Sequence, residues 1–130
     1  MDQQQKAKTS TDVTFENKNF PTQNTVSTQT VTDQAVSSFQ MVEDYLWDMF
    51  GDEDEFVVLT LADILHQIRF VQAAQIKNGL IVQLGIEEGD RIRLVEKECT
   101  REECMDIFRE YYNSSYVRDV EKYQPVAFYV

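Results

Sequence analysis

The sequence predicts an α+β fold, a two-layer sandwich in which an antiparallel β-meander of four to five strands is covered on one face by two helices. The predicted order is α-β-β-β-β-α-β. Two segments carry apolar residues at helical spacing, and three consecutive segments alternate apolar and polar residues. Two amphipathic helices need a sheet face to cover, and a meander offers one.

The chain has 130 residues, which suits one domain. Residues 1–31 contain few apolar side chains among many Gln, Thr, Asn and Ser. Such a stretch cannot bury enough surface to offset the entropy lost on ordering. We therefore predict that residues 1–31 form a disordered polar tail and that residues 32–130 form a single α+β domain.

The first helix is predicted over residues 36–50. Its apolar residues are spaced by three and four, which places them on one stripe: Val36, Phe39, Val42, Leu46, Met49 and Phe50. Thr32 or Asp33 can cap its start, and Gly51 stands where a left-handed stop residue belongs.

A buried strand is predicted over residues 56–61, followed by alternating strands over residues 66–76, 80–86 and 91–97. The Asn-Gly pair in residues 77–79 favours a tight hairpin. The side chains expected to face inward are Ile68, Phe70, Ala74, Ile76, Leu80, Val82, Leu84, Ile86, Ile92 and Leu94. Those expected to face outward include Gln67, Ala73 and Lys97, with Val71 and Val95 among them.

The second helix is predicted to begin at a capping box formed by Thr100 and Glu103 and to end near Asn113. Its apolar stripe is Cys104, Ile107, Phe108 and Tyr111. A final strand is predicted over residues 125–130, with Pro125 first, where its missing amide matters least.

The outward face of the meander is the first candidate for a partner-binding site. An ordinary solvated sheet face is one interpretation, and an interaction face with a weakly apolar centre and a polar rim is the other. The candidate residues are Arg69, Val71, Gln75, Ile81, Gln83, Arg91, Arg93 and Val95.

An acidic run over residues 43–55 is the second candidate, since it holds seven carboxylates and neither Lys nor Arg. Its candidate residues are Asp48, Asp52, Glu53, Asp54 and Glu55. The run suits a solvated surface or a docking surface for a basic partner. It lacks the alternating spacing and central glycine of a calcium-binding loop.

The formal net charge is −11, of which −10 lies after Ala35, where nineteen acids face nine bases. Such a surface repels nucleic-acid phosphates and anionic membranes, and it attracts basic proteins at long range. We therefore expect a protein partner, a basic one being favoured, and neither a nucleic acid nor a membrane.

No cofactor, metal or catalytic site is predicted. His66 is the single histidine, and with Asp63 nearby it supports only a minor enzymatic alternative. Cys99 and Cys104 are spaced C-x4-C without a second pair, so a zinc site is not expected. Cys104 falls on a helical stripe, whereas Cys99 ends a strand as a free thiol.

The segments HQIRFVQAAQI, GLIVQLGIEEGD and TREECMDIFREYY, within residues 56–112, resemble the layout of small acidic bacterial toxin-immunity proteins. That resemblance implies a non-enzymatic, cytoplasmic inhibitor that binds a toxin tightly, and it transfers no functional residue to this chain. The alternatives are a homodimeric structural or accessory protein joined through the sheet face around Val71, Ile81 and Val95, and a chaperone for a secreted protein. A cytoplasmic location is expected from two cysteines that make no disulfide framework and from an N-terminus without a signal peptide.

Overall fold

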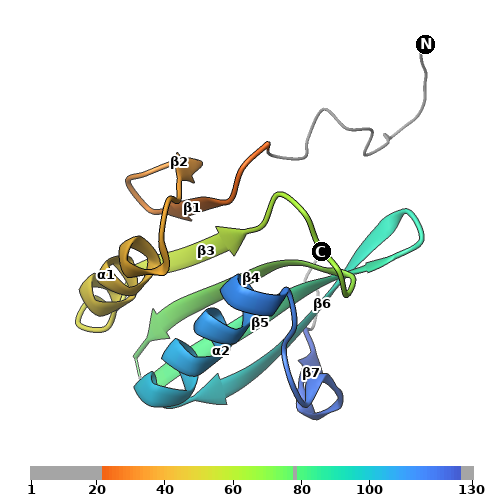
Figure 1. The fold of residues 1–130 in the computed structure, drawn as a ribbon. Coiled ribbons are helices and arrows are strands. Elements are labelled where there is room, and N and C mark those ends of the chain that lie inside the picture. The colour runs from red at the N-terminus through yellow and green to blue at the C-terminus, as the bar shows by residue number, and fades with distance from the viewer. Residues whose placement is uncertain (1–21, 78, 127–130) are drawn as a thin grey trace.

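The computed structural model describes residues 22–77 and 79–126 (Figure 1). Two α-helices, one short 3-10 helix and seven strands make up this part of the chain. In chain order they are β1 (Thr25–Thr28), β2 (Gln34–Ala35), α1 (Phe39–Met49), β3 (Phe56–Thr60), β4 (Ile68–Ile76), β5 (Gly79–Glu88), β6 (Arg91–Cys99), α2 (Arg101–Ser114), η2 (Val120–Lys122) and β7 (Gln124–Pro125).

The strands form one antiparallel sheet in the order β2-β1-β3-β4-β5-β6-β7. Helices α1 and α2 pack side by side on one face of it (Figure 1). The α+β class and the meander from β3 to β6 are confirmed. The predicted strand count and order are wrong in detail, because β1 and β2 precede α1 and the sheet has seven strands.

Strand β1 corrects the predicted extent of the polar tail. Residues Thr25–Thr28 pair with Val57 to Thr60 of β3, and the Val26 side chain is fully buried. One apolar side chain among its four residues is enough for β1 to form a strand, because β1 pairs with the apolar strand β3 and its Thr residues favour β structure. The prediction of disorder is thus wrong for β1, and residues 1–21 lie outside the described part.

The two helix starts differ in how well the sequence predicts them. Helix α2 begins at the predicted box: Glu103 N–H donates to Thr100 Oγ1 at 3.1 Å, and Thr100 N–H donates to Glu103 Oε1 at 2.9 Å. Helix α1 begins later than predicted, with Ser38 as its N-cap, and ends on Phe50 in a right-handed conformation. Gly51 is therefore not a left-handed stop residue.

The core lies between the helices and the sheet. Helix α1 buries Val42, Leu46 and Met49, and α2 buries Cys104, Phe108 and Tyr111. Beneath them the sheet contributes side chains that are at most 2 % exposed, namely Val26, Val57, Leu59, Val71, Ala73, Val82, Leu84 and Val95. Burial of this apolar surface is the main favourable contribution to folding.

This core reverses part of the predicted face assignment. In the β4–β5 hairpin Val71 pairs with Leu84 and Ala73 with Val82, so even-numbered residues of β4 share a face with odd-numbered residues of β5. Phe70 and Ala74 therefore cannot lie beside Leu80, Val82 and Leu84 as predicted. The hairpin register decides which alternating set is buried, and a shift of one residue exchanges the faces.

A register shift between Ile68 and Phe70 lets Ile68 face the core, where it is 3 % exposed. The Tyr111 hydroxyl of α2 donates to the Ile68 carbonyl oxygen at 2.8 Å. Burial raises the pKa of Tyr111, so this hydroxyl stays protonated and remains a donor. The bond ties the irregular start of β4 to the second helix.

Replacing Tyr111 with phenylalanine is expected to lower the free energy of unfolding by about 1–3 kcal/mol, because the Ile68 carbonyl loses its buried donor. Urea unfolding followed by circular dichroism measures the change. The control is Tyr112→Phe on the same helix, where the half-buried ring packs on Phe39. Equal losses in the two variants would contradict a specific role for the Tyr111 bond.

Candidate protein-binding site

Three rows of side chains cross the sheet on the face opposite the helices. The cross-strand register defines them, and together we call them the open face: Phe56, Ala74, Ile81 and Glu98; Val58, Gln72, Gln83 and Glu96; Thr60, Phe70, Gly85 and Leu94. No helix of the described residues covers this face (Figure 1). Most of these side chains are half-buried.

The open face combines two largely apolar rows with a polar row between them. Gln83 Nε2 donates to Glu96 Oε1 at 3.0 Å across β5 and β6, which holds both side chains in place. The rows contain no Lys or Arg, and their only charges are Glu96 and Glu98 on β6. An uncharged centre beside a carboxylate edge can exclude water on contact with a partner and still discriminate by charge.

Phe70 and Gly85 lie next to each other in one of the two apolar rows of the open face. Thr60, Phe70, Gly85 and Leu94 pair in register, and a Cβ atom at Gly85 would overlap the Phe70 ring. The ring therefore lies directly over the glycine, in the space that a Cβ atom would occupy. Gly85 has no positive φ, so its backbone conformation does not require glycine. Glycine is needed at this position because the Phe70 ring approaches the backbone too closely for a Cβ atom.

The residues predicted for the outward face of the meander lie on both sides of the sheet in the structure. Ile81 and Gln83 lie on the open face, whereas Val71 and Val95 are 0 % and 2 % exposed beneath the helices. Gln75 lies on the helix side and donates to the Gly79 carbonyl at 3.0 Å. The predicted outward placement of Val71, Gln75 and Val95 is therefore wrong, because the pairing of β4 and β6 with β5 puts these residues on the same face as Leu80 and Leu84.

The three predicted arginines lie near the ends of the strands. Arg69 Nη2 contacts Glu87 Oε2 at 2.6 Å, and Arg93 Nε contacts Glu88 Oε2 at 2.7 Å. Arg91 is exposed beside the β5–β6 turn. Arg69 and Arg93 are therefore already in ion pairs and lie outside the three rows of the open face.

The predicted acidic residues lie at the connection from α1 to β3. Asp48, Asp52, Glu53 and Asp54 are exposed, so they remain available to a partner. Glu55 has a structural role instead: its Oε1 accepts hydrogen bonds from the backbone N–H groups of Gln29 and Phe56, both at 2.9 Å. It thereby joins the end of β1 to the start of β3.

Sequence reasoning missed three exposed large apolar side chains. Trp47 is 57 % exposed beside the acidic residues of α1, Leu65 is 75 % exposed and Tyr116 is 44 % exposed. Trp47 could have been found, because it falls outside the buried stripe of its helix. Leu65 and Tyr116 belong to irregular segments, where no periodicity indicates exposure.

His66, the residue of the enzymatic alternative, is exposed in the segment before β4. Its ring lies edge-on to Tyr116, with 5.4 Å between the ring centroids. Within residues 22–77 and 79–126, no three His, Cys, Asp or Glu side chains are grouped so as to hold a metal ion. In the same ranges, no helix is long and apolar enough to cross a membrane.

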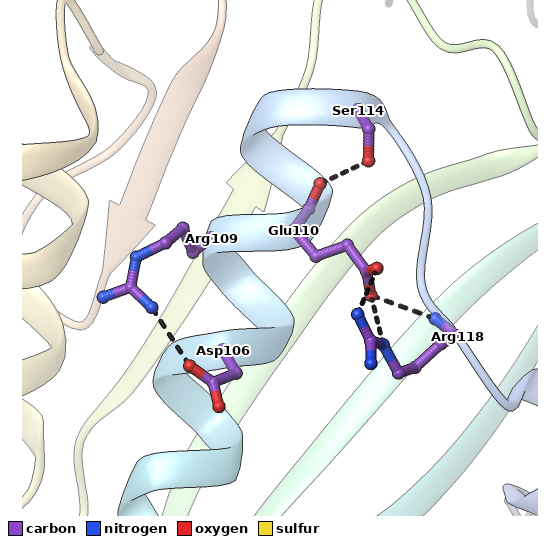
Figure 2. A network of polar contacts seen from close by, with 5 residues as sticks. All are labelled: Asp106, Arg109, Glu110, Ser114 and Arg118. Carbon is purple, nitrogen blue, oxygen red and sulfur yellow. Dashed lines mark hydrogen bonds and ion pairs between the residues drawn. The ribbon is translucent and has the colours of Figure 1, made fainter.

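A groove of about 430 Å³ lies on the helix side, between α2 and residues 118–123, and includes Lys97 of β6. Its charges largely neutralise one another (Figure 2): Arg118 Nη2 contacts Glu110 Oε2, and Arg109 Nη1 contacts Asp106 Oδ1, both at 3.0 Å. Exposed pairs of this kind contribute little to stability. Arg118–Glu110 holds the segment after α2 against the helix, whereas Arg109–Asp106 lies within α2 itself.

Comparisons with family models, with curated proteins and with solved structures find no match for this chain.

Proposed function

We propose that this protein is a non-enzymatic protein-binding module that contacts a basic partner through the open face. The observation that carries the proposal is the open face itself, whose apolar rows are left uncovered by the helices and whose only charges are carboxylates. Stable interfaces combine an apolar, weakly charged centre with a polar edge. The open face supplies two apolar rows for such a contact, separated by a polar row, and carries its charges at one edge, on β6.

Charge favours a basic partner over a second copy of this chain. Two copies, each with a net charge of −11, repel each other as they approach. A basic protein is attracted at long range, and the exposed Asp48, Asp52, Glu53 and Asp54 add to that attraction. An immunity-type inhibitor of a basic toxin, which the resemblance implies, is one form of this function, and a secretion chaperone is another.

The test compares the wild-type protein with Ile81→Lys, which places a cation in the middle of an apolar row of the open face. The control is Gln40→Lys, which makes the same change in charge at an exposed position of α1. Each protein is immobilised and exposed to an extract of its native cell. Bound proteins are identified, and the affinity of the purified partner is then measured at low and high salt.

We expect the wild type and Gln40→Lys to retain the same basic protein and Ile81→Lys to bind it at least about tenfold more weakly. Association with the wild type should slow as salt rises, because charge steering is screened. Identical binding by all three proteins would contradict the proposal. So would a wild-type dimer, seen by light scattering, that Ile81→Lys dissociates, since the homodimeric alternative would then hold.

A further inference from the structure

Cys99 and Cys104 lie together on the helix side of the sheet. Cys99 is the last residue of β6 and pairs with Leu80, a core residue, so it shares the inner face with Val95. Cys104 lies in the first turn of α2 and is fully buried. The two thiols are hydrogen-bonded to each other, and neither is in a disulfide.

The surroundings give the two sulfurs different reactivity. Cys99 is half-buried, whereas Cys104 is 0 % exposed. The hydrogen bond from Cys104 lowers the pKa of Cys99; burial and the Glu103 carboxylate act against it, and Lys97 adds to it. The same hydrogen bond and burial raise the pKa of Cys104. Of the two, the sulfur of the less buried Cys99 is thus the better nucleophile, and the buried sulfur of Cys104 lies beside it.

Tyr123 is a third reactive group close to the two cysteines. Tyr123 is 5 % exposed, and its buried hydroxyl has no hydrogen-bond partner within the described residues. Burial and then the neighbouring Cys99 raise the pKa of Tyr123, so the hydroxyl remains a donor close to both sulfurs. A buried donor without an acceptor is costly. An oxygen atom added to Cys99 would supply an acceptor.

We propose that Cys99 and Cys104 are a redox-active pair that a peroxide oxidises to an intramolecular disulfide, with Cys99 as the attacking sulfur and Cys104 as the resolving sulfur. In the first step the Cys99 thiolate attacks one peroxide oxygen, the O–O bond breaks, and hydroxide leaves from a sulfenic acid on Cys99. In the second step Cys104 sulfur attacks Cys99 sulfur and loses its proton, and the sulfenic oxygen leaves as water. Two thiols and one hydrogen peroxide become one disulfide and two waters.

Cys99 and Cys104 lie on either side of the start of α2. Thr100 and Glu103, which form the capping box, lie in the four-residue stretch between the two cysteines. A disulfide would close a small ring around that box and link the end of β6 to the first turn of the helix. The oxidised form therefore differs from the reduced form at a defined corner of the fold, beside the groove that Lys97 and Tyr123 line.

The experiment treats the reduced full-length protein with hydrogen peroxide and follows its intact mass, with peptide mapping for the linkage. Wild type should lose two hydrogens as a Cys99–Cys104 disulfide that dithiothreitol reverses, at least about tenfold faster than glutathione reacts. Cys104→Ala should accumulate a sulfenic acid on Cys99, trapped by dimedone. Cys99→Ala should react far more slowly, because Cys104 is buried.

Three results would overturn the proposal: wild-type protein linked only between molecules, wild-type protein oxidised no faster than glutathione, or equal reactivity in the two alanine variants. Circular dichroism establishes whether each variant is folded. Should Cys104→Ala fail to fold, the wild-type rate and linkage alone decide the matter, since both are measured on the unaltered chain.

Discussion

Replacing Val71 with lysine is expected to remove a large share of the protein's stability, whereas Ile81→Lys on a neighbouring strand is expected to change the stability little. Val71 is 0 % exposed and faces the helices, so a lysine there would be a buried charge without a partner. Such a charge costs about 3–5 kcal/mol, out of a total stability of about 5–15 kcal/mol for a typical domain. Urea unfolding followed by circular dichroism measures both variants.

Ile81 is the matched control because it lies on β5, which pairs with β4, but on the other side of the sheet. A lysine at this position faces solvent and lies across from Glu98 of β6, an opposite charge. We expect a loss of no more than about 1 kcal/mol. If Val71→Lys were tolerated as well as Ile81→Lys, the assignment of the two faces would be wrong.

The second large effect is expected for Gly85→Ala. The added methyl group would overlap the Phe70 ring, which must then leave the surface of β5. Overpacking of this kind costs about 1–3 kcal/mol. The control is Gly51→Ala, since a Cβ there meets nothing within 4 Å and the backbone has no positive φ.

A double variant separates the overlap from a general effect on the strand. In a Phe70→Ala background the ring is gone, so Gly85→Ala should cost far less than in the wild type. Thermal or urea unfolding of the four proteins of this cycle gives the coupling free energy. A coupling near zero would mean that Phe70 does not lie on Gly85.

Much of the fold could be predicted because its signals are local. Periodicity predicted two helices and the meander, and the spacing of Thr100 and Glu103 predicted the start of α2. Strand β1 could not be predicted, since its four residues are mostly polar and depend on pairing with β3. The prediction for Gly51 was wrong because a glycine after a helix often adopts the left-handed conformation but does not always do so.

The candidate site was predicted less well, for a reason that lies in the strands themselves. Both faces of β4 and β6 carry apolar residues, so alternation alone could not decide whether Val71 or Phe70 faced the core. Pairing with β5 decides it, because Leu80, Val82 and Leu84 form the only uninterrupted apolar set on that strand. Ile81 and Gln83 were placed correctly because they alternate with that set.

The position of β1 has a consequence for the order in which the chain acquires its structure. Strands β3 to β6 pair with their neighbours in sequence, whereas β1 pairs with β3 only after the chain has passed through β2 and α1. Local hairpins close at a lower entropic cost than such distant pairings. During synthesis β1 emerges before β3, so it can pair only with the short β2 until residues 57–60 have been synthesised. The earliest part of the described chain to be made is thus among the last to be fixed.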